Sequence, residues 1–196
     1  MKPIATDTID KARTPEAIEL LARAFHDDPV INWACNFPDS LEAFFDITLP
    51  PFVAHGLTYV DEEKRGVASW QGPNQAVRWP YTFSTIIDIL RLGGLKAVYR
   101  MAISGNTTER FHPQTPHYYL FAIGVLPQYK GQGVGTGLIS KVLRTCDEEK
   151  MPAYLENSKE ENLEFYQGHG FKVVEEIQIA SSSPPLWLMW RDPITE

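Results

Sequence analysis

Four glycines stand at alternate positions in one short stretch, which is the segment best suited to bind a ligand. Gly131, Gly133, Gly135 and Gly137 follow an apolar run that ends at Val125, and a helical pattern comes directly after them. Glycine lets the main chain adopt positive φ and approach a ligand closely. The first N–H groups of a helix are free and carry a partial positive charge. A strand, a glycine loop and a helix start in this order predict a backbone cradle for a diphosphate.

Two common nucleotide-binding loops match this stretch poorly. The dinucleotide fingerprint Gly-x-Gly-x-x-Gly/Ala has Thr136 in its third position when it starts at Gly131, and Leu138 when it starts at Gly133. The phosphate loop Gly-x-x-x-x-Gly-Lys-Ser/Thr has no matching register. Glu156 nevertheless follows at about the 20-residue distance of a ribose-binding acid, so a nucleotide-dependent oxidoreductase stays open as an alternative.

A third interpretation rests on a resemblance that covers about residues 118–190. Three strings carry it: VLPQYKGQGVG (125–135), YLENS (154–158), and Asn162-x-x-x-Tyr166-x-x-x-Gly170-Phe171. Together they resemble the acetyl-coenzyme A loop and the following motifs of the GCN5-related N-acetyltransferases, the GNAT family. Within it, PAYLENSKEENLEFYQGHGF (152–171) and the earlier Ala24-Phe25-x-x-x-Pro29 look most like the puromycin N-acetyltransferase branch. One departure is Lys130, where the family usually has Arg or Gln.

The resemblance implies a binding site for acetyl-coenzyme A. The pantetheine arm would pair with the main chain of Ile123, Gly124 and Val125 like an added strand. The N–H of Val125 would also face the thioester oxygen. The pyrophosphate would be held by the loop and the residues after it, namely Lys130, Gly131, Gln132, Gly133, Val134, Gly135 and Thr136. Asn162 would hydrogen-bond the coenzyme near the second helix.

The resemblance also implies two catalytic residues. Tyr166 would protonate the departing thiolate, because a phenol with a pKa of about 10 suits a thiolate whose thiol has a pKa of about 8.5–10. The attacking amine must lose a proton, since alkylammonium pKa values lie at about 10. Glu156, which ends its strand beside the loop, is the first candidate base, and a role in binding the amine fits it equally. His117, at the start of the central strand, is the second candidate.

The predicted reaction is direct transfer of acetyl to the primary amine of a small molecule. No acyl-enzyme is expected, because neither Cys35 nor Cys146 stands beside a credible base. The main alternative is a non-catalytic protein that binds or senses acyl-coenzyme A, with the oxidoreductase as a weaker one. The acceptor would be shaped by residues 25–33 and 81–101, which carry no diagnostic motif.

Composition narrows the remaining classes of function. The chain has 196 residues, 43% of them hydrophobic, and a net charge of −7. Phosphate binding favours a basic surface, so we expect no nucleic-acid partner. The two cysteines form no Cys-x-x-Cys pair, and no His, Asp or Glu cluster has ligand spacing, so neither a disulfide framework nor a metal site is predicted. Without a signal-peptide core or a run of about 18 apolar residues, we expect a cytoplasmic protein with no membrane partner. A homodimer stays open.

The first half of the chain predicts a helix-rich lobe with the first strands. We expect a strand over residues 3–8, a helix capped by Thr14 that ends at Asp28-Pro29, and a helix over residues 40–49 that resumes as far as 56. Residues 57–60 and 66–70 are typical of a hairpin. A helical region over residues 81–101 should break at Gly93-Gly94, and residues 104–116 should form a polar loop.

The second half predicts the strands and helices around the glycine loop. We expect strands over residues 117–125, 152–156, 171–179 and 186–191, and helices over 138–150 and 159–168. The first two of these strands should pair in parallel, because a crossover helix joins them. The resemblance implies an α/β (α+β) fold with a mixed, mostly antiparallel sheet of about seven strands flanked by helices. It also implies a single N-acetyltransferase domain over residues 1–196. Its acceptor-side lobe and first strands would cover about 1–116, and its coenzyme-binding and catalytic core 117–196.

Overall fold

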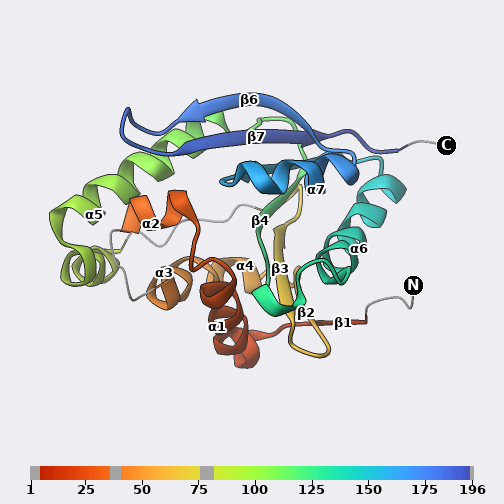
Figure 1. Ribbon diagram of the computed structural model, residues 1–196, viewed down its shortest axis with the longest axis horizontal. Coiled ribbons are helices and arrows are strands. Elements are labelled where there is room, and N and C mark those ends of the chain that lie inside the picture. Colours follow the sequence, from red (N-terminus) through yellow and green to blue (C-terminus); the bar gives the residue numbers. More distant parts are fainter. Residues whose placement is uncertain (1–4, 36–40, 76–81, 195–196) are drawn as a thin grey trace.

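One seven-stranded sheet runs through the chain with the strand order β1-β2-β3-β4-β5-β7-β6 (Figure 1). The computed structural model describes residues 5–35, 41–75 and 82–194. The strands are β1 (Thr6–Thr8), β2 (Thr58–Asp61), β3 (Gly66–Gln71), β4 (Tyr118–Val125), β5 (Ala153–Asn157), β6 (Lys172–Gln178) and β7 (Pro185–Arg191). Neighbours pair antiparallel, apart from the parallel pair β4 and β5. The mostly antiparallel sheet and its parallel central pair are confirmed.

Helices cover both faces of this sheet (Figure 1). They are α1 (Thr14–Ala24), α2 (Pro29–Cys35), α3 (Leu41–Thr48), α4 (Pro50–Val53), α5 (Phe83–Phe111), α6 (Val134–Glu148) and α7 (Leu163–Gly168). On one face, Leu138 of α6 shares an apolar cluster with Trp70 of β3. On the other face, Ile18 of α1 and Phe45 of α3 share a cluster with Val60 of β2. The sheet is therefore buried between two helical layers.

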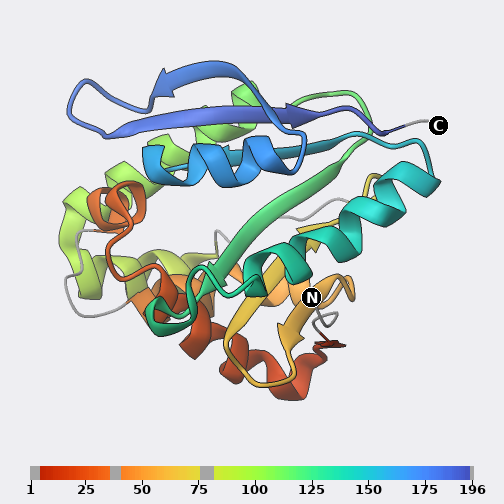
Figure 2. The same ribbon diagram turned by 45° about the vertical axis from the view of Figure 1, so that its right-hand side comes forward.

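Strand β4 diverges from β5 halfway along its length. It pairs with β5 from Tyr118 to Leu120, whereas its other edge stays paired with β3 as far as Val125. The register with β3 skips Phe121, which makes this the extra residue of a β-bulge. Bulges bend a strand and are common beside functional sites. Figure 2 shows β4 separating from the β5–β7–β6 half of the sheet.

Helix α6 starts where the glycine loop ends. Its buried side chains recur at helical spacing, at Val134, Leu138, Ile139, Val142, Leu143 and Cys146. The helix begins at Val134 rather than at the predicted Leu138, because its first turns include glycines that weaken the apolar pattern. Gly133 precedes it with a φ of 82°, in the left-handed region that favours glycine.

Helix α5 extends further than the sequence predicts. Residues 104–116 were expected to be a loop, but α5 continues to Phe111. The polar side chains are satisfied within the helix: the hydroxyl of Ser104 donates to the Arg100 carbonyl at 2.7 Å, and that of Thr108 to the Ser104 carbonyl at 3.1 Å. The predicted break is confirmed, since Gly94 has a non-helical φ of 70° and ψ of −171°.

The corner between α1 and α2 also differs from the prediction. Thr14 is the first residue of α1 and not its cap, and a 3-10 turn (Lys11–Arg13) precedes it. Helix α1 ends at Ala24, and Asp28-Pro29 starts α2 instead of ending α1. An acceptor side chain directly before proline at the first helical position is an N-cap signal.

The remaining elements lie close to their predicted places. The expected helix over 159–168 is divided into a 3-10 turn (Glu160–Asn162) and α7. The expected strand from residue 3, helix from residue 40 and helical region from residue 81 begin outside the described residues.

Candidate active site

A cavity of about 450 Å³ is lined by the part of β4 that diverges from β5. The predicted coenzyme residues that line it are Ile123, Gly124, Val125, Lys130, Gly131, Gly133, Val134, Gly135, Thr136 and Asn162. Gln132 is not part of its lining, and its side-chain amide donates to the Gln128 carbonyl at 3.1 Å. The fold therefore brings the strand, the glycine loop and the turn before α7 around one space.

The glycine loop has the backbone of an anion site. Gly131 and Gly133 have φ values of 76° and 82°. Turns of this kind direct successive N–H groups into a concave nest. The start of α6 follows with no acidic side chain in its first turn, so its positive end is not neutralised locally. The loop fits the pyrophosphate of a coenzyme.

Two further glycines allow close packing around the cavity. A Cβ on Gly135 would lie 3.3 Å from Cζ of Phe165, so glycine lets α7 approach the first turn of α6. A Cβ on Gly124 would lie 2.7 Å from Cβ of Ala24, closer than two such atoms can come. Strand β4 is thus pressed against α1 at the point where its other edge lacks a β5 partner. That free edge is suited to an extended amide chain.

Glu156 lies on β5 and lines the cavity. Its side chain is 9% exposed, and His112 Nδ1 lies 3.8 Å from Oε1. Oε1 is buried and accepts no hydrogen bond from the residues that the structure describes. Buried carboxylate oxygens normally have a donor. The Glu156 carboxylate therefore keeps an acceptor oxygen that no described residue uses.

Tyr166 lies on α7 and lines the same cavity. Burial and the nearby Asp28 carboxylate raise the pKa of its phenol above the ordinary value, so it stays protonated and able to donate. Burial also raises the pKa of Cys35 and of Cys146 to about 12. Neither thiol lines the cavity, and protonated thiols are poor nucleophiles.

His117, the second candidate base, is separated from Glu156 by the ring of His112. It is buried and lines neither this cavity nor the second one described below. Its Nδ1 is 2.7 Å from the Thr115 carbonyl, to which it donates, and its Nε2 is 3.2 Å from Nε2 of His112. Burial and the neighbouring His112 lower the pKa of His117, so the ring is neutral at neutral pH. His112, which no motif indicated, is the ring that lies between His117 and Glu156.

Asp28 lies in the segment 25–33 that was expected to shape the acceptor, but no sequence motif assigned this residue a role of its own. It is 1% exposed, accepts from the main-chain N–H of Ile31 at 2.8 Å and accepts from the hydroxyl of Ser158. Burial raises the pKa of its carboxyl. Next to it, Asp27 pairs with Lys159 Nζ at 2.5 Å. The turn before α2 is thereby joined to the end of β5. An acid directly before Pro29 was the sequence signal that could have indicated Asp28.

A second cavity of about 180 Å³ begins beside Asp28 and Glu156 and extends between α2, α3 and α5. It shares six lining residues with the first: Phe25, Asp28, Phe121, Ala122, Glu156 and Ser158. Both segments expected to shape the acceptor contribute to it, with Ile31 from residues 25–33 and Ile89 from residues 81–101. The two cavities meet at Glu156.

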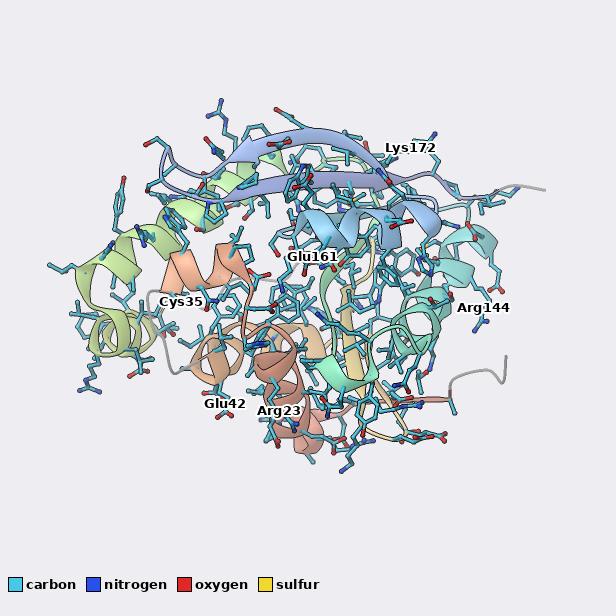
Figure 3. The ribbon with its side chains drawn as sticks, viewed as in Figure 1. Arg23, Cys35, Glu42, Arg144, Glu161 and Lys172 are labelled. Atoms are coloured by element: carbon cyan, nitrogen blue, oxygen red, sulfur yellow. The ribbon has the colours of Figure 1, made fainter. Side chains whose placement is uncertain are left out.

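Charged side chains of both signs lie on the outside of the fold, whereas two acids face the cavities. Arg23, Glu42 and Lys172 are exposed and point away from α1, α3 and β6 (Figure 3). Asp28 and Glu156 are the acids that face inward, where the two cavities join. A positively charged group placed between them would meet two carboxylates.

Comparison with known proteins shows similarity to acetyltransferases. The model of the acetyltransferase (GNAT) family matches residues 92–171, which hold the glycine loop, Glu156 and Tyr166. An uncharacterized N-acetyltransferase of Schizosaccharomyces pombe, C550.08, is 26% identical over 98% of this chain and 85% of its own. The segment that holds the glycine loop, Glu156 and Tyr166 is therefore similar to the GNAT acetyltransferases.

Solved structures share its fold. A crystal structure described as histone acetyltransferase HPA2 and related acetyltransferase, from Corynebacterium glutamicum, is 23% identical with a TM-score of 0.71, covering 99% of this chain and 98% of that one. The arylalkylamine N-acetyltransferase 2 of Aedes aegypti is 16% identical with a TM-score of 0.63, covering 96% and 98%. The family uses acetyl-coenzyme A as cosubstrate, so the oxidoreductase alternative is set aside.

Two structural features are absent from the described residues. No helix among them is both long and apolar enough to cross a membrane. No group of three or more His, Cys, Asp or Glu side chains among them is arranged to hold a metal ion.

Proposed function

We propose that this chain is a member of the GNAT family and transfers the acetyl group of acetyl-coenzyme A directly to the primary amine of a small molecule. One observation carries the proposal: Glu156 on β5 and Tyr166 on α7 line the same cavity as the glycine loop. A base for the amine and an acid for the sulfur are thus available on two sides of one space.

The chain's first task is to hold the coenzyme, which supplies the thioester. The main chain of Ile123, Gly124 and Val125 receives the pantetheine arm along the free edge of β4, with the N–H of Val125 toward the thioester oxygen. The loop and the start of α6 hold the pyrophosphate. Lys130 adds a positive charge at the cavity wall, in the place where the family usually has Arg or Gln. Asn162 hydrogen-bonds the coenzyme beside α7.

The second task is to move two protons. Glu156 accepts a proton from the ammonium group, directly or through one water, and the neutral amine then forms the C–N bond. Tyr166 donates its phenolic proton to the sulfur as the C–S bond breaks, and the second proton that the nitrogen loses on becoming an amide returns to the phenolate through water. The retained proton on Tyr166 and the unpartnered Oε1 of Glu156 support these roles.

The division of the chain into two functional parts belongs to the same proposal. Residues 117–196 supply Tyr166, Glu156 and most of the coenzyme cavity, whereas residues 1–116 supply most of the second cavity. The resemblance to the puromycin N-acetyltransferase branch adds aminonucleosides to the acceptors worth testing, although function is set by the site and not by the fold.

Thiol release from acetyl-coenzyme A, measured against a panel of primary amines, tests the proposed reaction. Glu156→Gln removes the base at nearly constant shape and should lower turnover by about 10²- to 10⁴-fold. Glu164→Gln is the matched control, because Glu164 is exposed on α7 and lines neither cavity. Wild-type turnover in Glu156→Gln would remove Glu156 as the base and leave it an amine-binding role.

The non-catalytic alternative gives a different outcome. A protein that only binds or senses acyl-coenzyme A would bind acetyl-coenzyme A in calorimetry and release no thiol with any amine of the panel. That result would refute the proposed function and leave the coenzyme site intact.

A further inference from the structure

The second cavity has a chemical character that the acetyl-transfer reaction alone does not require. Its charged lining side chains, among the residues that the structure describes, are Asp28 and Glu156, and both are acidic. Its opposite walls are apolar, from Val30, Ile31, Phe44, Ile47, Ile89 and Met101. Positive charge is favoured at the end that meets the coenzyme cavity, and apolar surface is favoured everywhere else.

Three of the hydroxyl groups in these walls already donate to main-chain carbonyls. Thr48 donates to the Phe44 carbonyl at 2.8 Å, Ser104 to the Arg100 carbonyl at 2.7 Å and Thr108 to the Ser104 carbonyl at 3.1 Å. The hydroxyl of Thr85 forms a hydrogen bond with that of Thr82 at 2.8 Å, in which either can be the donor. A carbonyl or carboxylate that entered between α3 and α5 would find no free donor among Thr48, Ser104 and Thr108.

Tyr119, Ser158 and the two acids collect the remaining side-chain polarity at one end of the cavity. Tyr119 lies beside Glu156, whose charge, together with burial, raises the pKa of its phenol, so that the hydroxyl stays protonated. Ser158 donates to Asp28. The cavity is therefore polar and negative at its junction with the coenzyme cavity and apolar in its depth.

From this arrangement we infer that the acceptor is a monoamine with an apolar body and no carboxylate. The ammonium group lies between Asp28 and Glu156, and the body extends between α2, α3 and α5. An amino acid would bring a carboxylate against two acids, a diamine would bury a second ammonium without a partner, and a peptide would leave amide carbonyls without donors. The inference rests on the proposed acetyl transfer at Glu156.

The size of the cavity limits the size of the body. At roughly 10–15 Å³ for each water-sized group, a cavity of about 180 Å³ holds roughly a dozen non-hydrogen atoms. Burial of each methylene contributes about 0.8 kcal/mol, so kcat/KM for straight-chain alkylamines should rise about three- to fourfold per added methylene. The rise should stop when the chain fills the cavity.

Matched pairs of amines test the inference by thiol release. We expect kcat/KM at least about tenfold higher for 2-phenylethylamine than for phenylalanine, and for n-hexylamine than for 1,6-diaminohexane. A tetrapeptide with a free N-terminus should be a poor acceptor. Equal or better use of the amino acid, the diamine or the peptide would overturn the inference and leave the proposed acetyl transfer standing. If none of the amines supported thiol release, both the inference and the proposed acetyl transfer would be overturned.

Two substitutions test whether the body occupies this cavity. Met101→Ala lengthens it and should shift the best alkylamine to a longer chain, whereas Ala34→Val narrows it and should shift the best chain to a shorter one. Leu92→Ala on the same helix as Met101 is the control, because Leu92 is 44% exposed and lines neither cavity. Calorimetry of n-hexylamine with coenzyme A present gives the same comparison without turnover. An unchanged chain-length optimum in both folded variants would overturn the placement.

Discussion

Removal of the Tyr166 hydroxyl separates acid catalysis from coenzyme binding. Tyr166→Phe keeps the ring, which is 8% exposed and packs edge-on against Phe165 and Phe171, and deletes only the oxygen. The fold should therefore be retained. The thiolate would then have to leave without a positioned donor, and turnover should fall.

The structure sets the size of that fall. General acid catalysis contributes about 10²- to 10⁴-fold, and its benefit shrinks as the pKa of the acid rises above that of the group it protonates. Burial and Asp28 raise the pKa of Tyr166, whereas a thiol of pKa about 8.5–10 needs little assistance. We therefore expect a fall in kcat of about 10- to 1000-fold, or about 1.4–4 kcal/mol in the activation barrier.

Thiol release at saturating amine and acetyl-coenzyme A measures kcat, and calorimetry measures the affinity for acetyl-coenzyme A. The affinity should change by less than about twofold, since the loop and the free edge of β4 bind through the main chain. Tyr99→Phe is the matched control, because Tyr99 is 65% exposed on α5 and lines neither cavity. Unchanged kcat in Tyr166→Phe would refute the role, and an equal loss of coenzyme affinity would reassign Tyr166 to binding.

Three further substitutions test the loop, the central strand and the buried histidine. Gly133→Val places a β-branched side chain at a φ of 82° and should weaken acetyl-coenzyme A binding at least about tenfold in calorimetry; Gly56→Val, at a φ of 76° outside the site, controls for backbone strain alone. Gly124→Ala overpacks β4 against α1 by about 1–3 kcal/mol and should lower Tm by about 2–10 °C, whereas Gly168→Ala, with open space around it, should not. His117→Gln should reduce the loss of stability on acidification: the folded pKa of His117 is lowered, so the unfolded chain binds more protons below about pH 6.5 and the wild type loses stability there. If the unfolding free energies of the wild type and of His117→Gln changed equally between pH 7 and 5, the lowered pKa of His117 would be contradicted.

The backbone geometry of the glycine loop could be predicted because its signal is local. A main-chain binding loop needs glycine at positive φ and a helix start directly after it, and both leave a pattern within a few residues. The positive φ values at Gly131 and Gly133 match that reasoning. Gln132 shows its limit, since alternation along the loop does not reveal that its side chain bonds back to Gln128.

Local patterns gave the wrong element at two places in the chain. The polar residues 104–111 resemble a loop, but Ser104 and Thr108 donate into their own helix and α5 continues through them. Asp28-Pro29 is compatible with a helix stop and with a helix start. In the structure Asp28 caps the start of α2 by accepting from the N–H of Ile31, and it also accepts from Ser158, which lies far along the chain.

The acceptor half had no signal of its own for a related reason. An apolar side chain that faces a cavity and one that faces the core occupy the same positions of a helix, so Ile89 and Met101 look identical in sequence to packing residues. The difference arises only when α2, α3 and α5 leave a space between them, next to two inward acids. Asp28 and Glu156 are separated by most of the chain, and the fold brings both to the lining of the same two cavities. The chemistry of the acceptor is therefore a property of the assembled fold, and the amine pairs test it more directly than any motif.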